Sequence, residues 1–568
     1  MPIPKTLKLA LACTIVSLSF GPAAYAESAS TPSASVLKSD NTLSSEFVYK
    51  YLIGEIAGQR GELNLASKLF LDLAKSTRDA RLAERAAQAA VFGNNATAAL
   101  EAANLWNNIA PESVEAQQAI TQMLVSIGHL DEAKPHLEKL LAKESTRANG
   151  FLHLNTLLQR QPDKAAVLAL VQELAKPYPE LPEAHFTIAT SALAIGDHGL
   201  ALDELQTADR LRPGWETSAI LHGQILFTQQ QPEAAIDFYR DFLQRYPEAS
   251  EVRLTLARLL VNQKRFEEAK TEFVKLVEAS NNNPEVLVVV GLLSFQSMEY
   301  EEAEQYFQNA LKEGFKNRDQ IYLYLGQIAE KQKKTEQAMT WYKQVKPGDH
   351  YIEAQFNIAN LVALSEGADA AVQMLSKLPD LNNEQQAAVV QAQANLLSRE
   401  KRYQDAFNLL EKAVATLPNT PDIIYDYAMA AERVQRVDLM EKELRKLIQI
   451  KPDFAQAYNA LGYTLADRNI KLEEAQKLIE KALTLSPNDH YILDSMGWVH
   501  YRMGKLDKAV DYLRRAYTAQ TDPEIAAHLG EVLWQQGKRE EAKRTWEDAL
   551  RAHPENEALL NTTRKFQQ

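Results

Sequence analysis

Alanine recurs at a nearly fixed interval along this chain, and that regularity limits the folds that the chain can adopt. In most cases a large apolar residue follows the alanine by four positions, and a small or apolar residue follows it by seven. Neighbouring alanines are 33 to 35 residues apart, with two double steps, at Ala66, Ala99, Ala133, Ala201, Ala235, Ala269, Ala303, Ala338, Ala371, Ala406, Ala475, Ala509 and Ala542. Met440 and a degenerate unit near Ala166 fill the double steps. A period near 34 residues therefore predicts about fifteen copies of one supersecondary unit.

Each unit has the marks of two antiparallel helices. A second small residue precedes many of these alanines by twelve positions, at Gly54, Ala87, Ala189, Gly223, Ala257, Gly291, Gly326, Ala394, Gly497 and Gly530. Proline often follows by twelve, at Pro111, Pro213, Pro247, Pro418, Pro487 and Pro554. Helices approach closely only where the facing side chains are small, and proline ends a helix because it lacks the N–H donor. Large residues beyond the alanine, such as Phe273, Phe307 and Trp546, are expected to fill the core.

The pattern resembles the tetratricopeptide repeat family, most clearly at 457–488, 493–517 and 526–556. The resemblance implies an all-α, right-handed superhelical solenoid of helical hairpins. The composition agrees, since helix formers are plentiful and the 568 residues include only 21 glycines. The expected organisation is a signal peptide, a flexible Ser-rich leader, an N-terminal array, an irregular hairpin and a C-terminal array, at 1–26, 27–45, 46–345, 346–385 and 386–568. The units near 143–180 and 345–385 are poorly patterned.

The N-terminus has the features of an export signal. Lys5 and Lys8 precede an apolar run at 9–20, and an A-x-A cleavage site stands at 24–26. Such a run is too short to span a bilayer as a resident helix. We therefore expect an exported protein of the periplasm, with an association with the outer membrane as a further possibility and no transmembrane helix in the mature chain.

The single cysteine leaves a second interpretation of this segment open. Residues 10–13, "ALAC", partly resemble a bacterial lipobox, in which Cys13 would be lipidated. Ala10 stands where such motifs usually have leucine, and only four residues separate Lys8 from Cys13. Cleavage after Ala26 is therefore favoured, and it leaves a mature chain without disulfides, zinc thiolates or a thiol nucleophile. Palmitate incorporation that is lost in Cys13→Ser would contradict this preference.

The sequence contains no signature of catalysis, metal binding or a cofactor. The net charge is −13 without a basic block, which argues against nucleic acid. Six residues lie between Gly497 and Gly504, and leucine follows Lys505, so this stretch is not a phosphate-binding loop. We expect Gly497 to be a close-approach residue and Gly504 a turn. The eleven histidines do not fall at metal-ligand spacing. His528 is interpreted as a packing residue or a residue of the groove rather than as a metal ligand. The chain is not expected to be an enzyme.

Aromatic residues near the C-terminus form a candidate binding surface. Trp498 directly follows Gly497 and should point away from the partner helix, in the same slot as Tyr463 of the preceding unit. The stripe in the concave groove, where first helices should lie, comprises Tyr463, Trp498, Tyr501, Arg502 and Trp534. Packing between adjacent first helices is an equally weighted alternative. On the groove interpretation, Trp498→Ala with Tyr501→Ala should abolish partner binding with little loss of helicity.

A narrower resemblance concerns function. Segments 53–92, 494–517 and 526–542 are similar to a proteobacterial envelope family that includes the outer-membrane lipoprotein adaptor of a carboxyl-terminal processing protease. That resemblance implies a scaffold that recruits a periplasmic serine protease and delivers peptidoglycan hydrolases to it. The alternative is an assembly factor for pili, secretion or exopolysaccharide export, because such repeats serve unrelated assemblies.

Overall fold

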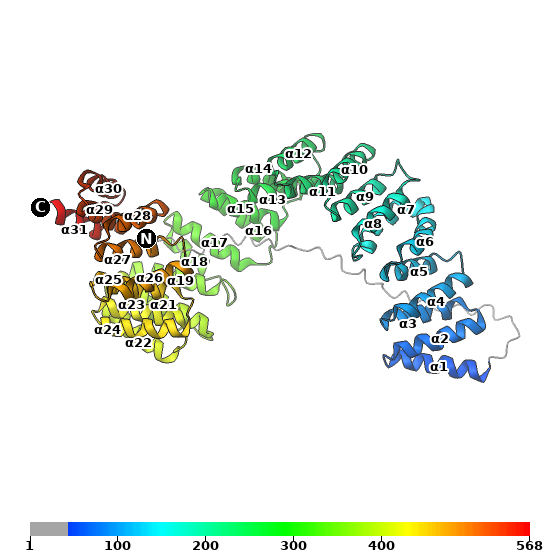
Figure 1. The fold of residues 1–568 in the computed structure, drawn as a ribbon, viewed down its shortest axis with the longest axis horizontal. Helices are drawn as coiled ribbons and strands as arrows, with labels where there is room; N and C mark the ends of the chain where they lie inside the picture. The colour runs from blue at the N-terminus through cyan, green and yellow to red at the C-terminus, as the bar shows by residue number, and fades with distance from the viewer. Residues whose placement is uncertain (1–43, 568) are drawn as a thin grey trace. The chain divides into compact units, whose positions relative to one another are not determined.

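The computed structural model describes residues 44–567, which form 31 α-helices and no strand (Figure 1). Thirty of these helices are the two arms of fifteen consecutive hairpins, and one helix follows them. This confirms the all-α solenoid and the number of repeats. The signal peptide, most of the leader and Cys13 lie outside the described residues. Close contacts divide the chain into two units, Met1–Ile225 and Leu226–Gln568, and the boundary falls inside one helix.

The first unit contains ten helices and most of an eleventh. They are α1 (Ser45–Gln59), α2 (Leu63–Thr77), α3 (Ala80–Phe92), α4 (Ala96–Ile109), α5 (Val114–Ser126), α6 (Leu130–Ala142), α7 (Glu144–Leu158), α8 (Lys164–Ala175), α9 (Pro182–Ala194), α10 (His198–Leu211) and α11 (Glu216–Thr228).

The second unit contains the remaining helices. They are α12 (Pro232–Arg245), α13 (Ser250–Asn262), α14 (Phe266–Ala279), α15 (Pro284–Gln296), α16 (Tyr300–Lys312), α17 (Arg318–Lys331), α18 (Thr335–Tyr342), α19 (Tyr351–Glu366), α20 (Ala368–Leu375), α21 (Asn383–Arg399), α22 (Tyr403–Thr416), α23 (Pro421–Arg433), α24 (Val437–Ile450), α25 (Ala455–Asp467), α26 (Leu472–Leu485), α27 (His490–Arg502), α28 (Leu506–Ala519), α29 (Pro523–Gln535), α30 (Arg539–Ala552) and α31 (Glu557–Gln567).

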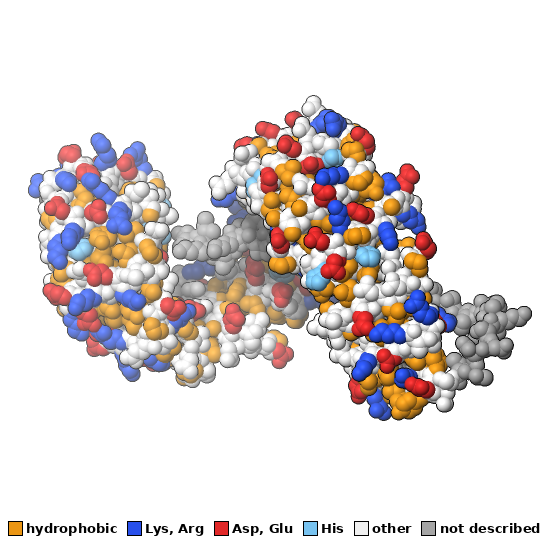
Figure 2. Space-filling view, turned by 45° about the vertical axis from the view of Figure 1, so that its right-hand side comes forward, with side chains coloured by type: hydrophobic (Ala, Val, Ile, Leu, Met, Phe, Trp, Pro, Cys, Tyr) orange, Lys and Arg blue, Asp and Glu red, His pale blue; other side chains and the backbone are white. Residues whose placement is uncertain are grey.

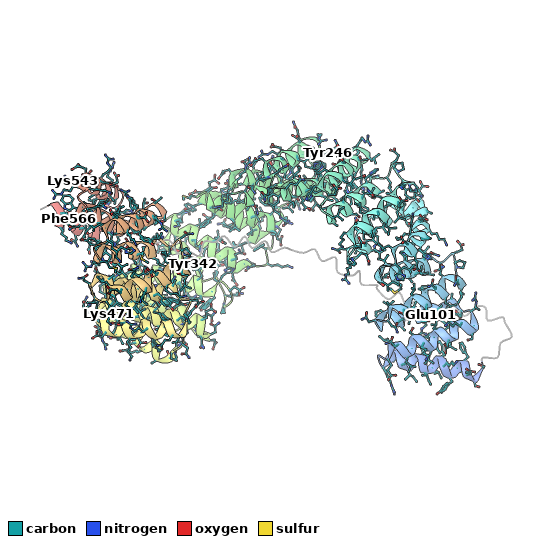
Figure 3. All side chains as sticks on the ribbon, viewed as in Figure 1. Glu101, Tyr246, Tyr342, Lys471, Lys543 and Phe566 are labelled. Carbon is teal, nitrogen blue, oxygen red and sulfur yellow. The ribbon has the colours of Figure 1, made fainter. Side chains whose placement is uncertain are left out.

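Small residues lie where the two helices of a hairpin meet, as the spacing predicts. A Cβ atom on Gly326 would lie 2.3 Å from Cε1 of Tyr342 (labelled in Figure 3), and one on Gly497 would lie 2.5 Å from Cγ of Leu513. Gly504 has φ +76° in the turn that follows α27. These observations confirm that Gly497 is a close-approach residue between the helices of a hairpin and that Gly504 belongs to a turn. The large residues opposite are core, and Trp546 is 2% exposed.

The glutamate that precedes the repeat alanine has a partner that the sequence pattern did not reveal. It forms an ion pair with a Lys or Arg on the second helix of the preceding hairpin, at Arg240–Glu268, Lys270–Glu302, Arg445–Glu474 and Arg514–Glu541. Most of these side chains are partly exposed, so each pair contributes on the order of 0–1 kcal/mol. The pairs join successive second helices along the outer side of the array.

The poorly patterned stretch at 143–180 coincides with an opened hairpin. Both α7 and α8 pack on α6 and α9, but α7 and α8 do not approach each other as the helices of other hairpins do. A cleft of about 1860 Å³ lies between α5, α6 and α7. In the second unit, α18 and α20 are each only eight residues long. Within residues 44–567, no helix is both long and apolar enough to cross a membrane.

Candidate protein-binding groove

The first helices of the last repeats line an inner face. Four pairs of successive first helices approach one another closely, α19 with α21, α21 with α23, α25 with α27 and α27 with α29, whereas successive second helices of that stretch show no comparable approach. Because neighbouring hairpins are therefore closer on one side than on the other, this part of the array curves with its first helices inside. The curvature is visible in the yellow-to-red part of Figure 1.

Four of the five residues predicted for the groove come together on this face. The ring of Trp498 stacks on His528, with centroids 4.2 Å apart, and lies 5.0 Å from the ring of Tyr501. The ring of Tyr463 also lies near His528, with centroids 6.2 Å apart. Trp498 is only 6% exposed, so much of its ring is packed between α25 and α29. Trp498→Ala would thus remove core packing as well as a contact surface, and the double substitution is a poor test of binding.

Arg502 has a structural role in addition to its place beside the aromatic residues. Its Nε donates a hydrogen bond to the carbonyl oxygen of Ala466 at 3.1 Å, and its Nη2 donates to that of Asp467. Both carbonyls belong to the last turn of α25, where helix C-termini favour positive charge. The guanidinium lies 5.7 Å from the ring of Trp498. Arg502 of α27 therefore caps the C-terminus of α25, the first helix of the preceding hairpin.

Trp534, the fifth predicted residue, has different ring partners. Its indole stacks on Trp546 at 5.9 Å and lies 5.9 Å from Phe566 of α31. Phe566 is labelled at the C-terminal end of the chain in Figure 3. The guanidinium of Arg539 lies 5.2 Å above the indole. The structure thus places Trp534 in the contact between the last hairpin and α31 rather than in the Trp498 stack.

Carboxylates are the groove residues that sequence analysis missed. They come from four first helices and are named here the acidic groove: Asp426, Glu432, Asp467, Asp494, Glu524 and Glu531. Burial, and then the negative charges of Asp467, Asp494, Glu524 and Glu432, raise the pKa of Tyr463. The shared effect on one tyrosine shows that carboxylates from three other elements converge on it. These carboxylates occupy different positions within their repeats, so no periodic pattern in the sequence marks them.

Only some of these carboxylates are neutralised. Asp494 forms an ion pair with His528 at 2.9 Å, and Glu531 forms one with Lys565 at 3.0 Å. Within residues 44–567, the other four carboxylates of the acidic groove form no ion pair. Asp467 accepts a hydrogen bond from the indole of Trp498 at 3.3 Å. The groove therefore carries negative charge that no ion pair among the described residues offsets.

The stability of the Trp498 stack should depend on pH. Burial lowers the pKa of His528, but the charge and hydrogen bond of Asp494 outweigh it and raise that pKa above 6.5. A raised histidine pKa stabilises the fold fully below the unfolded value and progressively less as pH rises through the folded value. We expect the free energy of unfolding to fall as the pH rises above the pKa of an unfolded histidine, and to fall more steeply in wild type than in His528→Gln.

Thermal unfolding at a series of pH values measures this difference. His553→Gln, which removes an exposed histidine after α30, is the control and should keep the wild-type slope. A His528→Gln profile parallel to wild type would show that the ion pair contributes nothing.

Asp426 should weaken the fold at neutral pH. Burial, opposed by a hydrogen bond from Gln391 at 2.6 Å, raises the pKa of Asp426 to about 6. The folded carboxyl then binds its proton more tightly than the unfolded one, so stability falls as pH rises from about 4 to 6. We expect Asp426→Asn to raise Tm at pH 7.5 by about 2–4 °C and to leave it unchanged at pH 4. Asp453→Asn, at an exposed position in the turn before α25, should change Tm at neither pH.

Comparisons with known proteins agree with this architecture. Tetratricopeptide repeat models match residues 226–290, 292–350, 455–489, 491–523 and 528–562. The TPR repeat-containing protein PA4667 of Pseudomonas aeruginosa is 32% identical over 492 residues, which cover 86% of this chain and 83% of that protein. The TPR repeat-containing protein YpiA of Bacillus subtilis is 22% identical, over 59% of this chain and 80% of its own length.

Similar solved structures include a TPR protein of Thermus thermophilus, which is 22% identical to this chain. The match covers 32% of this chain and 100% of that protein, with a TM-score of 0.30. The Cut9–Hcn1 hetero-tetramer of the anaphase-promoting complex matches 86% of this chain and 97% of its own, at 15% identity and a TM-score of 0.30. From the repeat models and the Pseudomonas relative, the chain belongs to the tetratricopeptide repeat family.

Proposed function

We propose that this chain is a non-catalytic scaffold whose acidic groove binds a positively charged segment of a partner protein. The observation that carries the proposal is the set of carboxylates without an ion pair, Asp426, Glu432, Asp467 and Glu524, on an inner face that also presents Tyr463. Uncompensated charge costs stability, and such groups gather where a ligand supplies the opposite charge. Aromatic rings beside the carboxylates favour lysine and arginine side chains of the partner.

For the partner, we propose a carboxyl-terminal processing protease together with its cell-wall hydrolase substrates. The support is the resemblance of segments 53–92, 494–517 and 526–542 to the adaptor of such a protease. The export signal at 1–26 would place the chain in the periplasm, where these enzymes act. The chain could in addition be anchored to the outer membrane through a lipid on Cys13. Palmitate labelling of wild type compared with Cys13→Ser tests this addition to the proposal.

The identifying experiment is a pull-down from envelope extract with the tagged mature chain, residues 27–568, and mass spectrometry of what it retains. The test variant combines Asp426→Asn, Asp467→Asn and Glu524→Gln. The control variant removes the same number of charges from second helices, with Glu473→Gln, Asp511→Asn and Glu540→Gln. A processing protease retained by wild type and control but lost from the groove variant supports the proposal.

Two other outcomes contradict it. Capture of pilus, secretin or polysaccharide-export components instead of a protease supports the assembly role. A protease retained equally by all three chains means that the partner binds outside the acidic groove.

A further inference from the structure

The first helix of the array has an apolar face that no other element within residues 44–567 covers. Its large exposed side chains are Val48, Tyr49, Leu52 and Ile56, with 41%, 65%, 53% and 48% of their surface exposed. They lie three, four, seven and eight positions apart, so they share one side of α1. Hydrophobic side chains also gather at the lower end of the right-hand body in Figure 2, where α1 lies.

This face is unusual because the end repeats of solenoids normally carry a polar outer side. The opposite side of α1 explains its fold, since Gly54 and Ala57 are buried against the second helix, where a Cβ on Gly54 would lie 3.0 Å from the ring of Phe70. The outward residues contribute nothing to that contact. An apolar stripe kept in water at the end of the array is the property of an interaction surface.

The charged residues of α1 are already paired within the chain. Lys50 lies 3.1 Å from Glu46 and 3.9 Å from Asp72, and Glu55 forms an ion pair with Arg85. The outward face therefore offers no unpaired charge to a charged partner. A partner that binds this face must therefore do so through apolar side chains, because the face offers no unpaired charge for an ion pair.

Three of the four exposed apolar residues are placed symmetrically about Leu52, whereas the mirror position of Tyr49 is occupied by Glu55. Val48 and Ile56 stand four positions to either side of Leu52. In an antiparallel pair of α1 helices related by a two-fold axis through Leu52, Val48 of one copy meets Ile56 of the other. Such self-complementarity is what an isologous dimer requires, whereas a foreign helix has no need of it.

The chain's own leader is a poorer occupant. Residues 27–43 are rich in serine and threonine and contain only three large apolar residues, Val36, Leu37 and Leu43. Their spacing does not repeat every three or four positions, as packing along α1 would demand.

We propose that two copies of this chain associate through antiparallel contact of their α1 helices, with the two-fold axis at Leu52. This surface belongs to the first unit and is distinct from the acidic groove of the second. One helix face provides an apolar area of a few hundred Å², and stable complexes bury roughly 1,200 Å² or more in total. The dimer is therefore expected to be weak and to form only at high protein concentration.

Cysteine cross-linking tests the geometry, because residues 27–568 contain no cysteine. On the two-fold axis, Leu52→Cys should form a disulfide with its own copy under mild oxidation at 50 μM. Val48→Cys and Ile56→Cys should each cross-link poorly alone and well when mixed. Leu364→Cys, at a position 76% exposed on α19, is the control for random collision.

Sedimentation between 1 and 200 μM tests the association without a cross-link. Wild type should shift toward a dimer as concentration rises, Leu52→Glu should remain a monomer, and Leu364→Glu should behave as wild type. Leu52→Glu should keep the wild-type Tm, since Leu52 is exposed.

Two results overturn the proposal. The first is that Leu52→Cys cross-links no faster than Leu364→Cys while the protein remains a monomer at 200 μM, which leaves α1 to a different protein. The second is that cross-linking appears only after residues 27–43 are deleted, which makes the leader the occupant.

Discussion

Replacing Trp546 with alanine should lower the free energy of unfolding of the last repeats by about 3–5 kcal/mol. Trp546 is 2% exposed in α30, and its indole is stacked on Trp534 and on Phe566, 5.9 Å and 5.7 Å away. Its Nε1 donates to the carbonyl oxygen of Ala527 at 3.4 Å. Truncation would leave a cavity that two flanking aromatic rings cannot close without rotating.

The effect should be local because each hairpin of a solenoid touches mainly its neighbours. Long arrays often unfold in parts, so hydrogen exchange followed by mass spectrometry is the appropriate measurement. Protection of amides in α29–α31 should fall, while that of α12–α17 should persist. A loss of protection below about 1 kcal/mol in α29–α31 would mean that the indole is not the core residue of this repeat.

The glycine opposite the indole provides a matched test of the same contact. A Cβ on Gly530 would lie 2.0 Å from Nε1 of Trp546, so Gly530→Ala should cost about 1–3 kcal/mol through overpacking. Combined with Trp546→Leu, it should cost less than the sum of the two single changes, because the smaller side chain leaves space for the methyl group. Gly58→Ala is the control, since its Cβ would meet nothing nearer than 4.0 Å.

Neutralising the acidic groove should weaken partner binding on the order of 100-fold at low salt. The change combines Asp426→Asn, Asp467→Asn and Glu524→Gln, each removing a charge that contributes about 1 kcal/mol to a solvent-accessible pair. Because Asp426 is destabilising in the free chain, the variant should bind less tightly while being at least as stable as wild type. That combination separates a binding defect from unfolding.

Salt provides a second criterion for the groove. Wild-type affinity for the captured partner, measured by calorimetry or interferometry, should fall between 0.05 and 0.5 M salt as the charges are screened. The groove variant should depend on salt much less. The second-helix control, with Glu473→Gln, Asp511→Asn and Glu540→Gln, should retain both the affinity and the salt dependence. Equal losses in the two variants would indicate only the effect of net charge.

The fold could be predicted from the sequence because its determinants are local and repeated. The small residues at Gly326 and Gly497 and the large ones at Tyr342 and Leu513 lie within one hairpin, so their spacing along the chain gives their contact. The same spacing distinguished Gly497 as a packing residue and Gly504 as a turn. Where the pattern weakens, at 143–180, the hairpin of α7 and α8 is indeed opened.

The candidate site could be predicted only in part. The sequence pattern placed Tyr463, Trp498, Tyr501 and Arg502 on the inner side of two neighbouring first helices, and the structure brings the four side chains together; their role in binding remains a prediction. Whether a residue on that face is free depends on side chains about 30 positions away. His528 covers one side of Trp498, and the end of α25 engages Arg502. No periodicity within one repeat contains that information.

The sequence by itself determined the repeat, the hairpin and the residues that meet inside each hairpin, because a helix fixes which positions lie three and four residues apart. Only the tertiary structure decided how neighbouring hairpins stack. Stacking brings the charges of Glu432, Asp494 and Glu524 from three other helices to bear on Tyr463, and it buries Trp498. It also leaves the apolar face of α1 exposed. Exposure and electrostatic potential are sums over residues that are distant in sequence, so they exist only once the array is assembled.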